Sequence, residues 1–239
     1  MNTAAEHLSG ALTIPFAGQK ILLLPQHAVW WPDQSTLFIA DVHLGKEATF
    51  RAAAIPVPDQ THRILQTLSA LIHATRAKQL IILGDLIHAR RGRCPDTFEL
   101  VHHWRQSNRS QVDILLVRGN HDRAAGDPPR DWHIHCTPEP TPRSPFSLHH
   151  FPPEPSDSPS LAGHLHPVVR LTGPARDSLR LPCFLQTGQT LVLPAFSTFV
   201  DGKVAAVKPG DRVFAIAENQ VLQISDTPRS TPHARKRRI

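Results

Sequence analysis

Four short segments of the 239-residue sequence combine carboxylate, imidazole and amide side chains, and each follows an apolar run. The segments are Asp41-Val-His43, Gly84-Asp85, Gly119-Asn-His-Asp122 and Gly163-His-Leu-His166. Oxygen and imidazole donors without thiolate favour Mn²⁺, Fe or Zn²⁺ over a structural zinc site. Two divalent ions about 3.5–4 Å apart need a shared donor. Asp85 is the natural candidate for that bridge, and the glycines of the last three segments are expected to relieve crowding beside it.

Each segment alone also fits an ordinary structural role. Asp41 and His43 could form a surface pair, and Gly84-Asp85 is a common turn sequence. The two longer segments could satisfy local backbone groups or simply end a strand. What favours a metal centre is the occurrence of all four in this order, each directly after an apolar run.

The apolar runs predict the elements that would position these side chains. Continuous apolar sequence at Thr36–Asp41, Leu80–Asp85 and Asp113–Gly119 is typical of strands buried on both faces. Pro58–Arg76 has the apolar spacing of an amphipathic helix, and a second helix is expected to begin near Pro95. Alternating strands and helices predict a largely parallel sheet, whose strands converge on one crevice at their carboxyl ends.

After Asp127 the sequence changes character. Ten prolines in the 34 residues 127–160 predict an extended surface loop, with one short strand at Phe146–His149. Short strands are then expected at Leu161–His164, Cys183–Gln186, Leu191–Pro194, Val204–Val207, Val213–Ala217 and Val221–Ile224. We predict one domain at 1–226 and a basic, disordered tail at 227–239.

The net charge of +6 belongs mainly to that tail. Five of the 26 Lys and Arg side chains lie beyond Asp226, which leaves 21 basic against 20 acidic side chains in residues 1–226. Such a tail is usually a solvated chain end, and otherwise it binds a polyanion weakly through electrostatic attraction. Three widely spaced cysteines predict free thiols, and no apolar run is long enough for a signal peptide or membrane span. We therefore expect a cytoplasmic protein with no membrane partner.

The ordered segments resemble the motifs DxH, GD, GNH[DE], a lone histidine and GHxH of the calcineurin-like metallophosphoesterase superfamily. This resemblance implies an α/β fold of the four-layer αββα sandwich type, with two packed sheets and helices outside. By resemblance, one ion is held by Asp41, His43, Asp85 and His166. The second is held by Asp85, Asn120, the lone histidine and His164. That histidine is His149 or His150, and we prefer His149 because it directly ends the strand at Phe146–Leu148.

Further segments are similar to the bacterial ligase-associated DNA damage response endonucleases. They include Ala40–Glu47, Phe50-Arg51, Ile55–Pro58, Leu181–Phe184 and Leu193–Phe196, whereas Phe199–Gly202 and the proline-rich loop depart from the pattern. This resemblance implies a phosphodiesterase or endonuclease that acts on DNA in repair, with a DNA ligase and other repair proteins as partners. A phosphoesterase on cyclic nucleotides or phosphomonoesters remains the alternative. A non-catalytic scaffold is disfavoured because the donor set is intact.

The expected chemistry is hydrolysis of a phosphate ester by a hydroxide that bridges two divalent ions, and the expected ion is Mn²⁺. His121 would donate a proton to the leaving oxygen. Asp122 would either orient His121 or make a local loop hydrogen bond. Arg123, Lys46 and Arg51 are candidates for binding phosphate, although each also fits a solvated surface charge.

Overall fold

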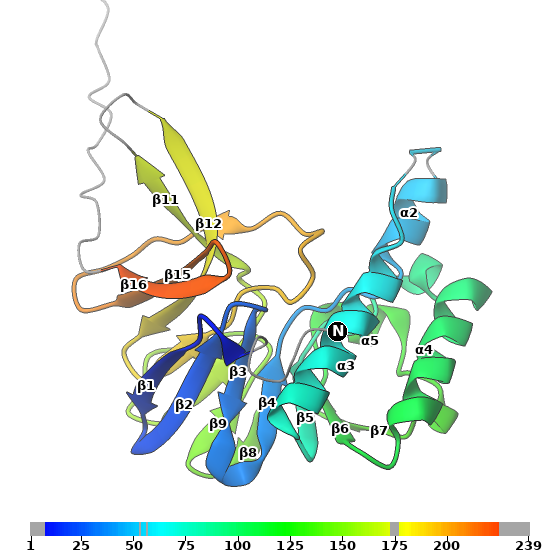
Figure 1. The fold of residues 1–239 in the computed structure, drawn as a ribbon, viewed down its shortest axis with the longest axis horizontal. Coiled ribbons are helices and arrows are strands. Elements are labelled where there is room, and N and C mark those ends of the chain that lie inside the picture. The colour runs from blue at the N-terminus through cyan, green and yellow to red at the C-terminus, as the bar shows by residue number, and fades with distance from the viewer. Residues whose placement is uncertain (1–7, 53, 56, 173–176, 225–239) are drawn as a thin grey trace, which may run out of the picture.

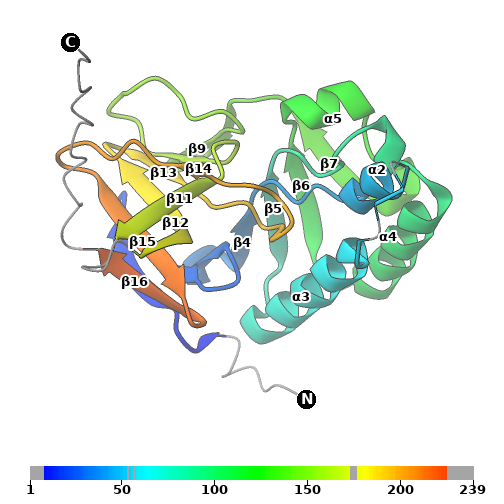
Figure 2. The same cartoon turned by 90° about the horizontal axis from the view of Figure 1, so that it is seen from above.

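The computed structural model describes residues 8–52, 54–55, 57–172 and 177–224, so the predicted tail at 227–239 lies outside it. Two β-sheets pack against each other and the α-helices lie outside them, as the ribbon in Figure 1 shows. The expected sandwich of two sheets with outer helices is thereby confirmed. The α-helices between Lys46 and Ala125 lie together on one side of the molecule (Figure 2).

The first sheet follows the order of the chain. Its strands are β1 (Leu12–Phe16), β2 (Gln19–Leu24), β3 (Ala28–Trp31), β4 (Thr36–Ile39), β5 (Gln79–Leu83), β6 (Asp113–Val117) and β7 (Ile134–Thr137). The strands β4 to β7 are parallel, whereas β1 to β4 pair in antiparallel fashion. The three predicted strands correspond to β4, β5 and β6, and the hairpins of β1 to β3 were not predicted.

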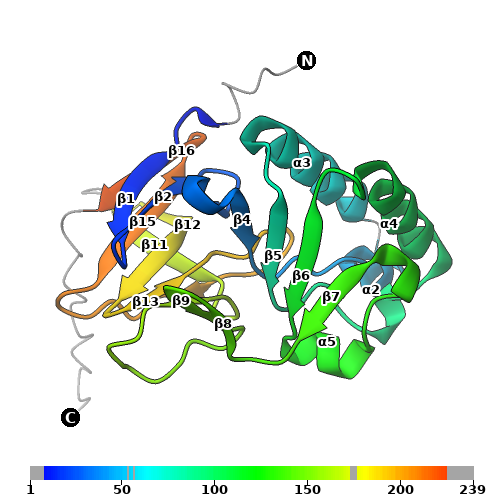
Figure 3. The ribbon, with the colours of Figure 1, turned by 90° about the horizontal axis from the view of Figure 1, so that it is seen from below.

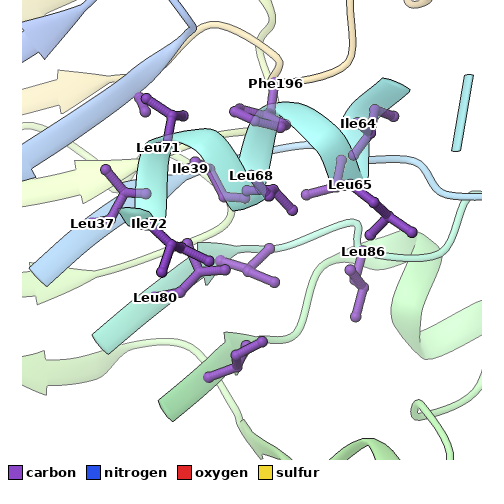
Figure 4. Packing of buried hydrophobic residues seen from close by; sticks show 14 of the residues in the cluster. Leu37, Ile39, Ile64, Leu65, Leu68, Leu71, Ile72, Leu80, Leu86 and Phe196 are labelled. Atoms are coloured by element: carbon purple, nitrogen blue, oxygen red, sulfur yellow. The ribbon is translucent and has the colours of Figure 1, made fainter. Parts of the chain in front are cut away.

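Helix α3 (Gln60–Thr75) covers one face of this sheet. Asp59 precedes it, and its side chain accepts a hydrogen bond from the backbone N–H of His62, as an N-cap does. Apolar side chains at helical spacing pack on β4 and β5, as Figure 4 shows. The other helices are α2 (Lys46–Ala52), α4 (Pro95–Asn108) and α5 (Asn120–Ala125), with 3₁₀ turns η1 (Pro32–Gln34), η2 (Arg90–Gly92) and η3 (Arg130–Trp132). The expected α3 and α4 are confirmed.

The second sheet is built from the second half of the chain. Its order is β14 (Lys203–Val204), β11 (Pro167–Thr172), β12 (Ser178–Thr187), β13 (Thr190–Val192), β10 (Ser160–Ala162), β9 (Phe146–Leu148) and β8 (Thr141–Arg143), with β15 (Arg212–Ala217) and β16 (Gln220–Ile224) continuing from β12. The strands β9, β10 and β13 are parallel to one another. Parallel strands therefore occur in both sheets.

Alternation along the buried strands builds two cores. Leu37 and Ile39 of β4 face the core beneath α3, whereas Phe38 and Ala40 face the core between the two sheets. The side chains of β5 alternate between the same two cores. The inter-sheet core also contains Phe146 and Leu148 of β9 and apolar residues of β10, β12 and β13. Burial on both faces explains why these strands lack polar alternation.

The segment at 127–160 is more regular than predicted. It contains β7, which pairs in parallel with β6, and the antiparallel pair of β8 and β9. The chain crosses between the sheets from Thr137 to Thr141 (Figure 3). Pro142 fits β8 because this strand ends the sheet path and has an unpaired edge. The predicted short strand at Phe146–His149 is confirmed as β9. The extended loop predicted around it was wrong for β7, which contains no proline, and for β8, whose edge position tolerates proline.

Two expectations from composition can also be compared with the structure. Cys94, Cys136 and Cys183 are free thiols, as predicted. Among the described residues, no helix combines the length and apolar character needed to cross a membrane.

Candidate metal centre

The predicted donors lie at one edge of the sandwich, beyond the carboxyl ends of parallel strands. Asp41 and His43 follow β4, Asp85 follows β5, and Asn120 follows β6 in the first sheet. His150 follows β9 in the second sheet, and His164 and His166 follow β10. The Asp41 N–H donates to the Gly84 oxygen at 3.1 Å within the first sheet, and the His164 N–H donates to Asp41 Oδ2 at 2.8 Å between the sheets. The two sheets therefore contribute to a single cluster.

A first group consists of Asp41, His43 and His166, whose donor atoms lie within 4.8 Å of one another. Asp41 Oδ1 is 3.3 Å from His166 Nε2, and Asp41 Oδ2 accepts a hydrogen bond from the His164 N–H at 2.8 Å. Asp41 is fully buried, and its Oδ1 makes no well-formed hydrogen bond within the described part of the chain. An unsatisfied buried carboxylate oxygen is costly, so this atom is suited to a cation.

A second group consists of Asp85, His150 and His164, with Asn120 beside them. The Nε2 atom of His150 lies 3.0 Å from Asn120 Oδ1, 3.1 Å from His164 Nδ1 and 3.4 Å from Asp85 Oδ2. One ring nitrogen cannot satisfy an amide oxygen, a carboxylate and another imidazole nitrogen together. The two groups adjoin, because His150 Nδ1 is 3.9 Å from Asp41 Oδ1.

The geometry replaces His149 with His150 as the seventh candidate donor. His150 is completely buried in the cluster, and its Nδ1 pairs with the Leu83 oxygen at 3.0 Å. His149 instead pairs through Nε2 with the Ser147 hydroxyl at 2.9 Å. The preference for His149 overlooked strand alternation: residues 146, 148 and 150 point to the inter-sheet side, and 147 and 149 point away. That period of two was visible in the sequence.

The backbone is unusual at most of the donors. Asp41, His43, Asp85, His164 and His166 all have positive φ, between 44° and 67°. Residues other than glycine rarely adopt this region, and such strain concentrates at functional sites. The adjoining glycines are required by space: a Cβ on Gly119 would lie 2.2 Å from Asp85 Oδ1, and one on Gly163 would lie 2.8 Å from Asp41 Oδ2. The predicted crowding is confirmed at these two positions.

The charges of the cluster also match a cation site. Burial, and next the charge of Asp41, raises the pKa of Asp85 from 3.8 to about 8. Burial, and next the neighbouring imidazoles, lowers the pKa of His43 to about 2. The protein alone thus disfavours the carboxylate charge and holds the imidazole neutral. Metal ions bind carboxylates and neutral imidazoles, so the residues present fit divalent cations.

His121 lies beside the second group without joining it. Its N–H donates to Asp85 Oδ1 at 2.9 Å, and its Nε2 is 3.9 Å from Asp85 Oδ2. Its Nδ1 pairs with the backbone oxygen of His88. A carbonyl can only accept, so Nδ1 carries a hydrogen and Nε2 is the atom that can exchange a proton at the site.

Asp122 has the second of its two predicted roles. Its buried carboxylate accepts hydrogen bonds from the backbone N–H groups of Asp85, Leu86, Ile87 and Gly119, at 2.7 to 3.3 Å. It makes no side-chain contact with His121 among those that the structure records. Asp122 therefore fixes the loop that carries Asp85 relative to the loop that carries Asn120.

The three predicted phosphate-binding side chains are placed differently. Arg123 donates to Glu139 Oε1 at 3.2 Å and lies 5.9 Å from the centroid of the Phe151 ring. Lys46 is half-buried, with Nζ 5.9 Å from the centroid of Phe199. Arg51 is exposed on the last turn of α2. Arg123 and Lys46 lie near the cluster, and Arg51 is recorded only as a surface charge.

Sequence reasoning missed two residues that touch the cluster. The His88 ring stacks on His121, with centroids 5.1 Å apart, and its Nδ1 is 3.4 Å from His43 Nδ1. Glu139 accepts from the backbone N–H groups of His150 and Phe151, both at 2.9 Å. His88 is three residues beyond Asp85, which was a weak signal, whereas Glu139 is surrounded by prolines and carried none.

These elements and donors agree with the comparisons with known proteins. The family model described as calcineurin-like phosphoesterase matches residues 35–171, and the chain belongs to that family. It is a metal-dependent phosphoesterase. Among solved structures it is similar to the crystal structure of the Pseudomonas putida nuclease MPE, with a TM-score of 0.77 and 38% identity over 89% of this chain and 100% of that chain. The comparison with curated proteins returned no match.

Proposed function

We propose that this phosphoesterase is a dinuclear nuclease that hydrolyses phosphodiesters of DNA. The first group of donors would hold one ion, and the second group with Asn120 would hold the other, with Asp85 shared. When bound, divalent ions supply an activated water and positive charge for the phosphate. The observation that carries the proposal is the convergence of seven oxygen and nitrogen donors, in two adjoining groups, in a chain similar to a nuclease.

His121 would supply the proton that the leaving oxygen needs. Its Nδ1 is engaged by the His88 oxygen, so its orientation is fixed and only Nε2 is free for transfer. Asp85 accepts from the His121 backbone N–H, which couples the position of the ring to the shared donor. A general acid held in this way contributes about 10²–10⁴-fold to a rate.

The ion is proposed to be Mn²⁺, with Fe and Zn²⁺ as the alternatives, because the donors are oxygen and imidazole nitrogen without thiolate. A role in DNA repair, a cytoplasmic location, and partnership with a DNA ligase and other repair proteins are proposed from the motif resemblance. The basic residues 229–238 could add a loose electrostatic contact with the polynucleotide.

A substrate panel tests the proposal. The full chain loaded with Mn²⁺ is incubated with labelled DNA, a cyclic nucleotide, a phosphomonoester and an aryl phosphodiester. We expect cleavage of DNA that is lost in both Asp85→Asn and His121→Ala. Turnover of the small esters without any DNA cleavage would sink the nuclease proposal and favour the small-molecule alternative. Hydrolysis that survives both substitutions would refute the site assignment.

A further inference from the structure

An exposed aromatic ring adjoins the proposed metal centre. Phe151 follows His150, and its ring centroid lies 4.1 Å from that of His164 and 4.9 Å from that of His150. Phe151 is 37% exposed, and it is the only aromatic residue among the exposed large apolar side chains of the described residues. Its apolar surface therefore borders the place where a phosphate would bind.

A charged neighbour binds the backbone at Phe151. Glu139 Oε2 accepts from the Phe151 N–H at 2.9 Å, and Glu139 Oε1 accepts from Arg123 Nη2 at 3.2 Å. The Arg123 guanidinium lies 5.9 Å from the Phe151 centroid. Burial of Glu139 is outweighed by these hydrogen bonds, and its pKa is lowered. Glu139 thus fixes the backbone of Phe151 and the guanidinium of Arg123, so less conformational freedom is lost when a ligand binds there.

A second pair of aromatic and cationic side chains lies near the first group of donors but is less exposed to solvent. Phe199 and Phe50 contact each other with centroids 5.2 Å apart, and both are only partly exposed. Lys46 lies over Phe199 at 5.9 Å. These rings contact each other and are less exposed than Phe151, which leaves Phe151 as the better surface for a flat ligand.

A flat ring beside a phosphate site suits a nucleobase. Bases stack on aromatic side chains regardless of sequence, because every base has a π-face. In a duplex each base is already stacked and paired within the helix, so contact with a protein ring requires an unpaired base.

We propose that Phe151 stacks on an unpaired nucleobase adjoining the phosphodiester at the metal centre. This inference rests on the proposed nuclease function. Arg123 serves the same contact as a positioned cation beside the ring rather than as a free phosphate clamp, because Glu139 already binds it. Phe151 is thus a specificity residue for the reaction.

A substrate with a single phosphodiester tests the contact without ambiguity of position. The Mn²⁺-loaded full chain is compared on a dinucleoside monophosphate and on its counterpart in which abasic sugars replace the nucleosides. We expect Phe151→Leu to lower kcat/KM for the first substrate by about 5- to 150-fold, the value of one stacked base, and to leave the abasic substrate little changed. Phe151→Trp should retain activity. Leu222→Ala removes an apolar side chain that is 48% exposed on β16, and it serves as the control.

A binding measurement gives a second readout that needs no turnover. Metal-free protein should quench the fluorescence of a 2-aminopurine base in a short single strand, and Phe151→Leu should abolish the quenching. Equal losses on the two diesters, or no loss on either, would overturn the inference while leaving the nuclease function intact. Failure of the unmodified protein to cleave labelled DNA would instead overturn the nuclease function on which the inference rests.

Discussion

Asp122 offers a sharp test of how the site is built, because its carboxylate holds two donor loops without being a proposed donor. It is 2% exposed and accepts hydrogen bonds from four backbone N–H groups. Asp122→Ala would leave these groups without their acceptor. Each buried unsatisfied group costs about 1–3 kcal/mol. Water entering the vacated space would satisfy some of these groups, so we expect the free energy of unfolding to fall by about 3–5 kcal/mol.

Such a loss is a large part of the roughly 5–15 kcal/mol that stabilises a domain. It corresponds to a fall in Tm of about 6–20 °C for a chain of this size. The assay is urea and thermal unfolding of metal-free protein in chelator, so that loss of bound ions does not contribute. Asp131→Ala is the matched control, since this carboxylate is 57% exposed and, within the described residues, its recorded ion pair is with His102 at 2.8 Å. If Asp122→Ala costs no more than Asp131→Ala, the proposed structural role is wrong.

Three further predictions concern the cluster itself. His121→Ala should lower kcat about 10²–10⁴-fold for esters with an alkoxide leaving group, and much less for a p-nitrophenyl ester, whose leaving group needs no proton; equal losses would argue against the proton-transfer role. In the metal-free protein the raised pKa of Asp85, about 8, means that the folded state binds the extra proton, so stability should fall as pH rises from about 6.5 to 8. The raised pKa of His166 changes stability in the same direction, whereas the lowered pKa of His43, about 2, affects stability only below about pH 6.5. Asp85→Asn should weaken this loss of stability with rising pH. Unfolding curves at several pH values would measure it. Gly163→Ala would place a Cβ 2.8 Å from Asp41 Oδ2 and should lower metal content after dialysis, whereas Gly188→Ala, with nothing within 4 Å of the added carbon, should not change it.

The parts of this protein that could be predicted from sequence are those with a local signal. Buried parallel strands read as apolar runs, and helix α3 has a clear period and an N-cap at Asp59. The donor segments at their ends were predicted because each follows such a run. The topology then brought Asp41 and His164 together, which no local pattern could have indicated.

The features that were not predicted depend on tertiary contacts, which the order of residues along the chain does not indicate. The strands β1 to β3 are as long as β4 to β6, but β1 buries only alternate side chains and contains Pro15, so it lacks the continuous apolar run of β4 to β6. Proline in β8 is tolerated only because that strand lies at an edge, which is a property of the sheet. The contacts of His88 and Glu139 with the cluster likewise arise from loops that meet only in the folded chain.

The division of donors between the sheets has a consequence for the lifetime of the protein. In both groups the first sheet supplies the carboxylates and the second supplies histidine, and Asp41 and His164 are separated by 123 residues. An ion held in either group would act as a removable cross-link between the two halves of the sandwich. At a free concentration one hundred times its Kd, such an ion would add about 2.7 kcal/mol to stability. A chain starved of metal would open more often and be degraded sooner, so metal supply would govern its abundance as well as its turnover.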